Sequence, residues 1–272
     1  MREYAVRYEQ GVKHQTNTRQ VIRSMALSIL SSIKSGDRSN FLKCVYCHYV
    51  FDDQIALFES KVKLMMSAGK FVDTSTALDM IEGKRPVDGQ FFHLSFDDGF
   101  KNVVKNALPI LDRYRVPSLF FVPTAFVGAP YEKVADYCVR IAEYGSPIEM
   151  CSWDDLKRAR DSGMEIGSHT RTHARFSEIS SSPSLLMEEF AGSKNDIESI
   201  LGVPCTTISW PYGRMDDADE ISVRATQRAG YRACFGAFRG AVRNGGCDPF
   251  MIPRHHFETQ WPDRHVQYFM FS

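Results

Sequence analysis

The chain has 272 residues, of which 43% are hydrophobic, so it carries enough apolar material for one large core. Lys plus Arg and Asp plus Glu each number 33, and this balance gives no basic excess typical of nucleic-acid-binding proteins and no acidic excess typical of disordered tails. No apolar run approaches the roughly 20 residues that a membrane-spanning helix needs. We therefore expect a folded protein with no nucleic-acid partner and no transmembrane segment.

The start of the chain, MREYAVRYEQGVKHQ, is polar and lacks the apolar stretch and small-residue cleavage site of a secretory signal. The seven cysteines are an odd number without regular spacing, which is typical of a protein kept reduced. Both observations favour a cytoplasmic location.

Residues 19–36 are predicted to form the first helix, since their apolar positions repeat at helical spacing and the stretch ends in Ser-Gly. The apolar positions are Ile22, Met25, Ala26, Ile29, Leu30 and Ile33. The simplest interpretation is a helix packed on the main domain, with a dimer contact or a membrane-surface helix as alternatives. We assign residues 1–40 to an N-terminal helical extension and residues 41–272 to the main domain.

From residue 41, short apolar strands alternate with amphipathic helices. Strands are predicted at 41–50, 91–96, 118–123, 164–169, 205–210 and 250–257. Helices are predicted at 52–69, 102–114 with a kink at Pro109, 152–163, 183–202 and 218–230. The alternation and the short connections predict parallel strands in a barrel or a doubly wound sheet, in which chemistry gathers at the C-terminal ends of the strands.

Two adjacent carboxylates, Asp97 and Asp98, follow the strand at 91–96 and precede a glycine. Neighbouring residues of a strand point to opposite sides, so both acids would chelate one ion only if the backbone turned. We expect instead that one binds a metal and the other handles protons, with Gly99 permitting a sharp turn. The alternative is a turn that caps the helix at 102–114.

His169 and His173 lie four residues apart in SHTRTH, just after another predicted strand. If the chain turns helically there, both imidazoles face one way and can share a metal, whereas the alternative is two surface histidines. Two histidines and one carboxylate make a zinc-type set with a position open for water, and the spare carboxylate could then serve as a general base. This arrangement indicates metal-dependent amide hydrolysis.

The segments LSFDDGF, SHTRTH and SWPYG, in this order and at strand ends, resemble the motifs of the polysaccharide deacetylases with NodB homology (carbohydrate esterase family 4). The resemblance covers about residues 41–257. It implies an α/β fold, a distorted (β/α)7-type barrel, here with the N-terminal helical extension. It also implies removal of acetyl groups from glycans with one divalent metal ion, for which we expect zinc, with cobalt, nickel, iron or manganese as alternatives.

The same resemblance assigns roles to residues of the three motifs. Asp98 corresponds to the metal-ligating aspartate, with His169 and His173 as the other ligands. Asp97 corresponds to the catalytic base. Tyr212 would give its backbone N–H to the developing oxyanion, a donor that contributes a few kcal/mol in comparable sites.

The chain also departs from the family pattern. Ser209 stands where many members carry an arginine, and Arg254 resembles the substitute, where it could pair with Asp97 and keep it ionised; an arginine bonding to backbone is the alternative. The Leu-x-x-His segment that usually supplies a general acid is missing. His256, predicted to share a strand face with Arg254, is the candidate acid, and a water or His93 could replace it.

Two further residues are less informative. His48, on the first strand, is interpreted as a buried core histidine, with a position in the pocket as the alternative. Trp210 adjoins the oxyanion segment and is the best of the three tryptophans for stacking on a sugar, although tryptophan more often packs in a core.

The predicted function is removal of an N-acyl group, most simply N-acetyl, from an amino sugar of a surface polysaccharide or its cytoplasmic precursor. The partner is then an acylated amino sugar or glycan, linked to a nucleotide, to a lipid or within a polymer. Removal of a formyl group is one alternative. A non-catalytic glycan-binding protein on the same scaffold, or an amidase acting on a non-sugar substrate, are the others.

Overall fold

The computed structural model describes residues 3–12, 39–244 and 246–271. The helix predicted at 19–36, and the oligomer contact considered for it, lie outside the described residues. Within the described part of the chain, every helix is too short or too polar to cross a bilayer.

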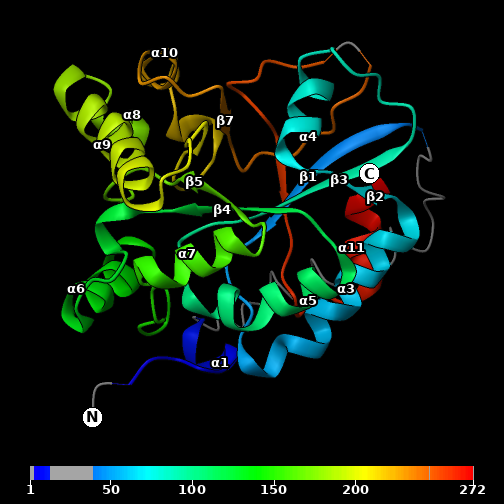
Figure 1. Ribbon diagram of the computed structural model, residues 1–272, viewed down its shortest axis with the longest axis horizontal. Helices are drawn as coiled ribbons and strands as arrows, with labels where there is room; N and C mark the ends of the chain where they lie inside the picture. The colour runs from blue at the N-terminus through cyan, green and yellow to red at the C-terminus, as the bar shows by residue number, and fades with distance from the viewer. Residues whose placement is uncertain (1–2, 13–38, 245, 272) are drawn as a thin grey trace.

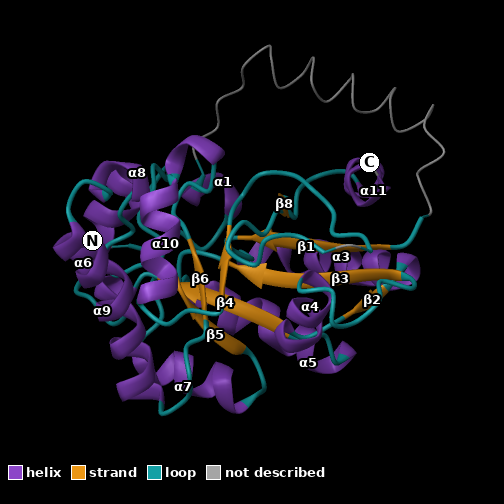
Figure 2. Ribbon diagram, turned by 90° about the horizontal axis from the view of Figure 1, so that it is seen from above, coloured by secondary structure: helices purple, strands orange, loops and turns teal. Residues whose placement is uncertain are grey.

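Parallel strands form one sheet at the centre of the molecule (Figure 2). They are β1 (Phe41–Cys47), β2 (Lys70–Phe71), β3 (Gln90–Phe96), β4 (Ser118–Val122), β5 (Glu165–Ser168), β6 (Thr207–Ser209), β7 (Ala233–Phe235) and β8 (Arg254–His256). Their order is β7-β6-β5-β4-β3-β1-β8, with β2 pairing with β3. A parallel bridge between Phe235 and Ile252 joins the two edges and nearly closes the sheet, which confirms the predicted (β/α)7-type barrel.

Helices surround this barrel (Figure 1). They are α1 (Tyr8–Gly11), α3 (Ile55–Ala68), α4 (Thr74–Ile81), α5 (Leu108–Tyr114), α6 (Tyr131–Asp136), α7 (Trp153–Asp161), α8 (Phe176–Ile179), α9 (Pro183–Leu201), α10 (Glu220–Arg228) and α11 (Asp263–Phe271). Helices α3 and α11 pack together on one side, and α8, α9 and α10 pack together on the other (Figure 1).

The predicted helices and strands are all present, although several are shorter than the sequence pattern suggests. The last strand covers only Arg254–His256, and the short strands β2 and β7 and the helices α4, α6 and α11 were not predicted. Pro109 does not kink a continuous helix. It lies in the first turn of α5, after a π-helical segment at Val103–Ala107, where a missing N–H costs little.

Apolar side chains fill the barrel beneath the C-terminal ends of the strands. One buried cluster includes Leu119 and Phe121 of β4 together with Phe235 of β7. The Arg254 guanidinium lies over the rings of Phe121 and Phe235, at 5.2 and 5.9 Å from their centroids. The polar residues of the candidate site therefore lie above a solid apolar layer, at the end of the barrel where such folds place their chemistry.

Candidate active site

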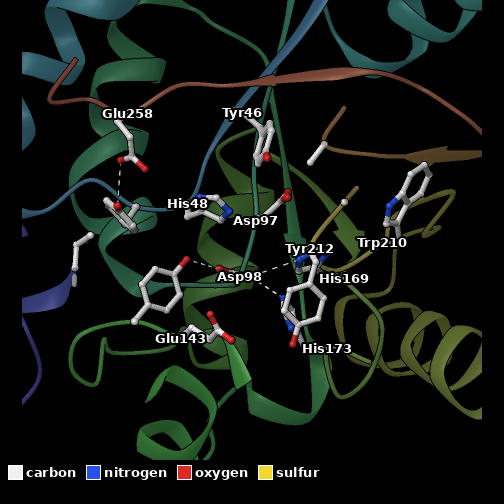
Figure 3. A pocket seen from close by; sticks show the side chains of 16 residues that line it. Tyr46, His48, Asp97, Asp98, Glu143, His169, His173, Trp210, Tyr212 and Glu258 are labelled. Atoms are coloured by element: carbon white, nitrogen blue, oxygen red, sulfur yellow. Dashed lines mark hydrogen bonds and ion pairs between the residues drawn. The ribbon is translucent and has the colours of Figure 1, made fainter. Parts of the chain in front are cut away.

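A left-handed turn separates the two adjacent carboxylates at the end of β3. Asp98 and Gly99 have φ angles of 72° and 73°, and the side chains of Asp97 and Asp98 take different directions into one cavity (Figure 3). A Cβ at position 99 would lie 3.2 Å from the Met150 side chain and 3.3 Å from Pro123. Glycine is thus favoured at position 99 both by the backbone conformation and by the close neighbours.

Asp98 faces His169 and His173. Its Oδ1 lies 3.5 Å from Nε2 of His169 and 3.3 Å from Nε2 of His173, and all three residues are buried (Figure 3). Burial alone would raise the pKa of Asp98, but hydrogen bonds with the two histidines outweigh it and hold that pKa well below its ordinary value. One ionised carboxylate and two imidazoles, with donor atoms within 4.8 Å of one another, fit a divalent metal of the zinc type.

The loop that carries the two histidines is not helical, so the helical turn expected for SHTRTH is wrong. Thr170 and His173 both have a φ of 63°. The loop folds around the buried carboxylate of Glu189, on α9, which accepts hydrogen bonds from the backbone N–H groups of Arg171 (2.9 Å) and Thr172 (2.8 Å). The Thr172 hydroxyl adds a third bond at 2.7 Å. A distant acid, rather than helical spacing, brings the imidazoles together.

Ser209 orients the ring of His169. The Nδ1 atom of His169 lies 3.0 Å from the Ser209 carbonyl oxygen and 2.7 Å from its hydroxyl. In the tautomer with hydrogen on Nδ1, that nitrogen donates to the carbonyl and Nε2 keeps its lone pair toward Asp98, as metal-binding histidines commonly do. The position at which the sequence departs from the family pattern therefore supports a histidine of the site.

Asp97 and Arg254 form a buried bidentate pair. The two terminal guanidinium nitrogens of Arg254 donate to the two carboxylate oxygens of Asp97, each at 2.7 Å. Arg254 also donates through Nε to the Gly236 carbonyl (2.7 Å) and through a terminal nitrogen to the Ser95 hydroxyl (3.1 Å). Burial would raise the pKa of Asp97, but the charge and hydrogen bonds of Arg254 lower it overall, so the carboxylate is ionised and fixed in orientation.

The backbone of Tyr212 borders the same cavity. Tyr212 has a φ of 62°, and within the described residues its N–H has no hydrogen-bond acceptor. Its hydroxyl donates to the Ile141 carbonyl (3.0 Å), and the Arg175 guanidinium stacks on its ring at 3.7 Å. The next residue, Gly213, comes so close to Ala237 that an added Cβ would lie 2.2 Å from the alanine Cβ. The tight turn of WPYG thus leaves a backbone donor available beside the histidines.

His256 and His48 lie on the other side of the cavity, near Glu258. Nε2 of His256 is 3.3 Å from a carboxylate oxygen of Glu258, and the rings of His256 and His48 are 5.0 Å apart. His48 and Glu258 line the cavity, whereas His256 does not (Figure 3). The interpretation of His48 as a core histidine is therefore wrong. The signal was present, since His48 is the first residue after β1, the position where this fold places functional groups.

Two other candidates lie away from any substrate. His93 is buried, with Nε2 3.1 Å from the Thr74 hydroxyl, and burial together with the charge of Arg254 lowers its pKa to about 4. Trp210 is 1% exposed and its indole N–H donates to the Arg214 carbonyl (3.2 Å), so it offers no face to a sugar. Trp210 packs in the core.

The cavity has a volume of about 310 Å³ and is lined by Asp97, Asp98, His169, His173 and Tyr212, together with His48 and Glu258. It is large enough for a sugar ring and its acyl group. The structure thus brings five of the sequence-predicted site residues to one cavity, places Arg254 directly behind Asp97, and places His256 behind His48.

Sequence comparison finds relatives with the same kind of site. A poly-β-1,6-N-acetyl-D-glucosamine N-deacetylase of Staphylococcus aureus (strain MRSA252) is 27% identical over 206 residues, which are 72% of this chain and 64% of that protein. The chain spans 55% and 64% of the length of two curated relatives, from Bacillus subtilis and S. aureus.

Solved structures share the fold. IcaB from Ammonifex degensii superposes with a TM-score of 0.71 at 23% identity, over 87% of this chain and 99% of that one. A de-N-acetylase from Aggregatibacter actinomycetemcomitans gives a TM-score of 0.69 at 19% identity, over 85% of this chain and 100% of that one.

The sequence pattern of one family matches a long part of the chain. The polysaccharide deacetylase family matches residues 84–234, from before β3 to β7, and this region contains the FDDG, HTRTH and WPYG segments. Because the match covers more than half of the 272 residues, the protein belongs to the polysaccharide deacetylase family.

Proposed function

We propose that this protein is a metal-dependent hydrolase that removes an N-acyl group, most simply N-acetyl, from an amino sugar of a glycan. The observation that carries the proposal is the Asp98–His169–His173 cluster beside the Arg254-held carboxylate of Asp97, all in or against one cavity. The S. aureus relative is described as acting on a polymer of N-acetylglucosamine, which supports an acetylated amino sugar as the substrate.

The metal would be held by one carboxylate oxygen of Asp98 and by Nε2 of His169 and His173. Zinc is the ion we expect on this donor set, and cobalt, nickel, iron or manganese are alternatives. When bound, such an ion polarises a carbonyl and lowers the pKa of a water molecule. Glu189 and Ser209 support this set by fixing the histidine loop and the His169 ring.

Asp97 would act as the general base. Its ionised carboxylate accepts a proton from the attacking water as a bond forms between the water oxygen and the acyl carbon. The acyl oxygen gains negative charge, and the backbone N–H of Tyr212 donates to it. The carbon–nitrogen bond then breaks, the nitrogen takes up a proton, and the products are a free amino sugar and a carboxylic acid.

The proton for the leaving nitrogen would come from His48 rather than from His256. His48 lines the cavity, and within the described residues its ring has no hydrogen-bond partner, so its nitrogens are available to a substrate. Glu258, whose pKa burial raises, lies on the same side of the cavity and makes an ion pair with His256. His256 and Glu258 would then hold His48 in place.

The test is to measure acetate and formate release from acylated glucosamine oligosaccharides and acylated nucleotide sugars, with added zinc and after chelation. We expect acetate release that stops on chelation, returns with zinc and is lost in Asp97→Asn, while this variant still binds the metal. Formate as the main product would change the acyl group. Activity that is indifferent to chelation, or glycan binding without turnover in both proteins, would refute the proposed function.

A further inference from the structure

Two tyrosines outside the three motifs donate hydrogen bonds to the metal-ligand carboxylate. The Tyr137 hydroxyl lies 3.0 Å from Oδ1 of Asp98, and the Tyr144 hydroxyl lies 2.5 Å from Oδ2. Tyr137 is completely buried, and Tyr144 lines the cavity. Both oxygens of one carboxylate are therefore bonded by hydroxyl groups of the same segment.

Aromatic packing fixes both hydroxyl groups. Tyr137 begins a π-helical turn at 137–141 that extends α6, and its ring stacks on Phe126 with centroids 4.3 Å apart. The ring of Tyr144 packs edge-on against Phe100 at 5.1 Å and against Tyr49 at 6.0 Å. Single-turn π segments are frequent at functional sites because they reposition the side chains that follow.

The first described segment of the chain holds the loop after Tyr144. The Gly145 N–H donates to the Gly11 carbonyl (2.9 Å), and the Ser146 hydroxyl donates to the Gln10 carbonyl (2.6 Å). The segment that presents Tyr144 is thus supported from both sides, by the aromatic cluster and by the N-terminal residues.

These contacts fix the rotation of the Asp98 carboxylate. Oδ1 is the oxygen that faces both imidazoles, and rotation about the Cβ–Cγ bond would break the hydroxyl bonds at both oxygens. We propose that Tyr137 and Tyr144 are positioning residues of the metal centre, which hold Oδ1 of Asp98 toward His169 and His173. This inference rests on the proposed function, since it assigns the metal site to these ligands.

The test compares Tyr137→Phe and Tyr144→Phe with wild type in metal affinity. The matched control is Tyr49→Phe, which also removes a buried hydroxyl at the cavity, but one that bonds to Glu258 (3.0 Å) instead of Asp98. Zn²⁺ and Co²⁺ affinities would be measured by competition with a chromogenic chelator, and the visible spectrum of the Co²⁺ protein would report the ligand geometry.

We expect roughly 10- to 100-fold weaker metal binding in Tyr137→Phe and Tyr144→Phe, an altered Co²⁺ spectrum, and turnover that recovers in excess metal. The control should keep the affinity and spectrum of wild type. Wild-type affinity in both variants would overturn the inference and leave the proposed function standing, whereas a wild-type protein that takes up neither metal would overturn both. If one variant fails to fold, the other carries the test, because each removes one bond to the same carboxylate.

Discussion

Replacing Arg254 by methionine is expected to leave Asp97 as a buried carboxylate without its charged partner. Arg254 is 0% exposed and Asp97 is 3% exposed, so water cannot replace the two 2.7 Å hydrogen bonds that the substitution removes. Breaking one side of a buried ion pair costs about 3–5 kcal/mol of unfolding free energy. Arg254→Lys keeps the charge but loses the bidentate geometry, so it should lie between wild type and Arg254→Met.

The same substitution should raise the pKa of Asp97. In the wild-type protein the effect of Arg254 outweighs burial and lowers this pKa, whereas in Arg254→Met burial acts with less opposition. A neighbouring arginine typically lowers a carboxyl pKa by about 1–3 units, so the acid limb of kcat/KM should move to higher pH by a similar amount. Asp97 would then lose its role as an ionised base in mildly acidic solution.

The sign of the stability effect follows from linkage. In wild type the lowered pKa of Asp97 adds stability above the unfolded-state pKa of about 3.9, and this stability is lost as the pH falls through the folded-state value. In Arg254→Met a raised pKa makes the ionised carboxylate destabilising at neutral pH and less so as the pH falls. The difference in unfolding free energy between the two metal-free proteins should be largest near neutrality.

Urea unfolding of the metal-free proteins at several pH values, with pH–rate profiles of the zinc-loaded proteins, measures both effects. A difference in unfolding free energy that does not change with pH, together with an acid limb that does not move, would refute the assignment of Arg254 as the partner that keeps Asp97 ionised.

Three further substitutions test other parts of the site. Glu189→Gln should lower the unfolding free energy by about 1–3 kcal/mol and weaken Zn²⁺ binding, since it removes the charge that orders the histidine loop; unchanged urea midpoints and affinity would contradict this. Gly213→Ala should reduce turnover with metal affinity retained, because the new Cβ would displace the WPYG turn from Ala237; full turnover would count against the Tyr212 donor. His48→Gln should slow hydrolysis of the amide by roughly 10²- to 10⁴-fold but spare 4-nitrophenyl acetate, whose leaving group needs no proton, and this pattern in His256→Gln instead would transfer the acid role.

The barrel and most of the site could be predicted from short-range features of the sequence. Alternating strands and helices indicate parallel topology, and the strand-end rule singles out Asp97, Asp98 and His169 before any geometry is known. Strands as short as Ala233–Phe235 carry too few residues for a hydrophobic period, so β7 escaped prediction. The C-terminal helix α11 was missed for a different reason, since its apolar face is defined only by the contacts it makes with α3.

The supporting residues could not be predicted because their roles depend on tertiary contacts. Glu189 lies in the middle of a long amphipathic helix, and only the fold shows that its carboxylate lies beneath the histidine loop. Tyr137 and Tyr144 are ordinary aromatic residues in a segment without a clear period, yet both reach Asp98. Residues that bind a metal carry a chemical signature in the sequence, whereas the residues that orient those ligands belong to many types.

Backbone strain gives independent support for the location of the site. Among the described residues, the non-glycine residues with positive φ are Asp98, Arg115, Glu143, Thr170, His173 and Tyr212. All of them except Arg115 line the cavity or lie between its two histidines, and positive φ is especially unfavourable for a β-branched residue such as Thr170. Such conformations cost about 1–3 kcal/mol each and persist only where the surrounding structure enforces them. The hydrogen bonds from Glu189, Ser209 and the two tyrosines supply that enforcement, which explains why a chain with ordinary helices and strands concentrates its unfavourable backbone at one end of the barrel.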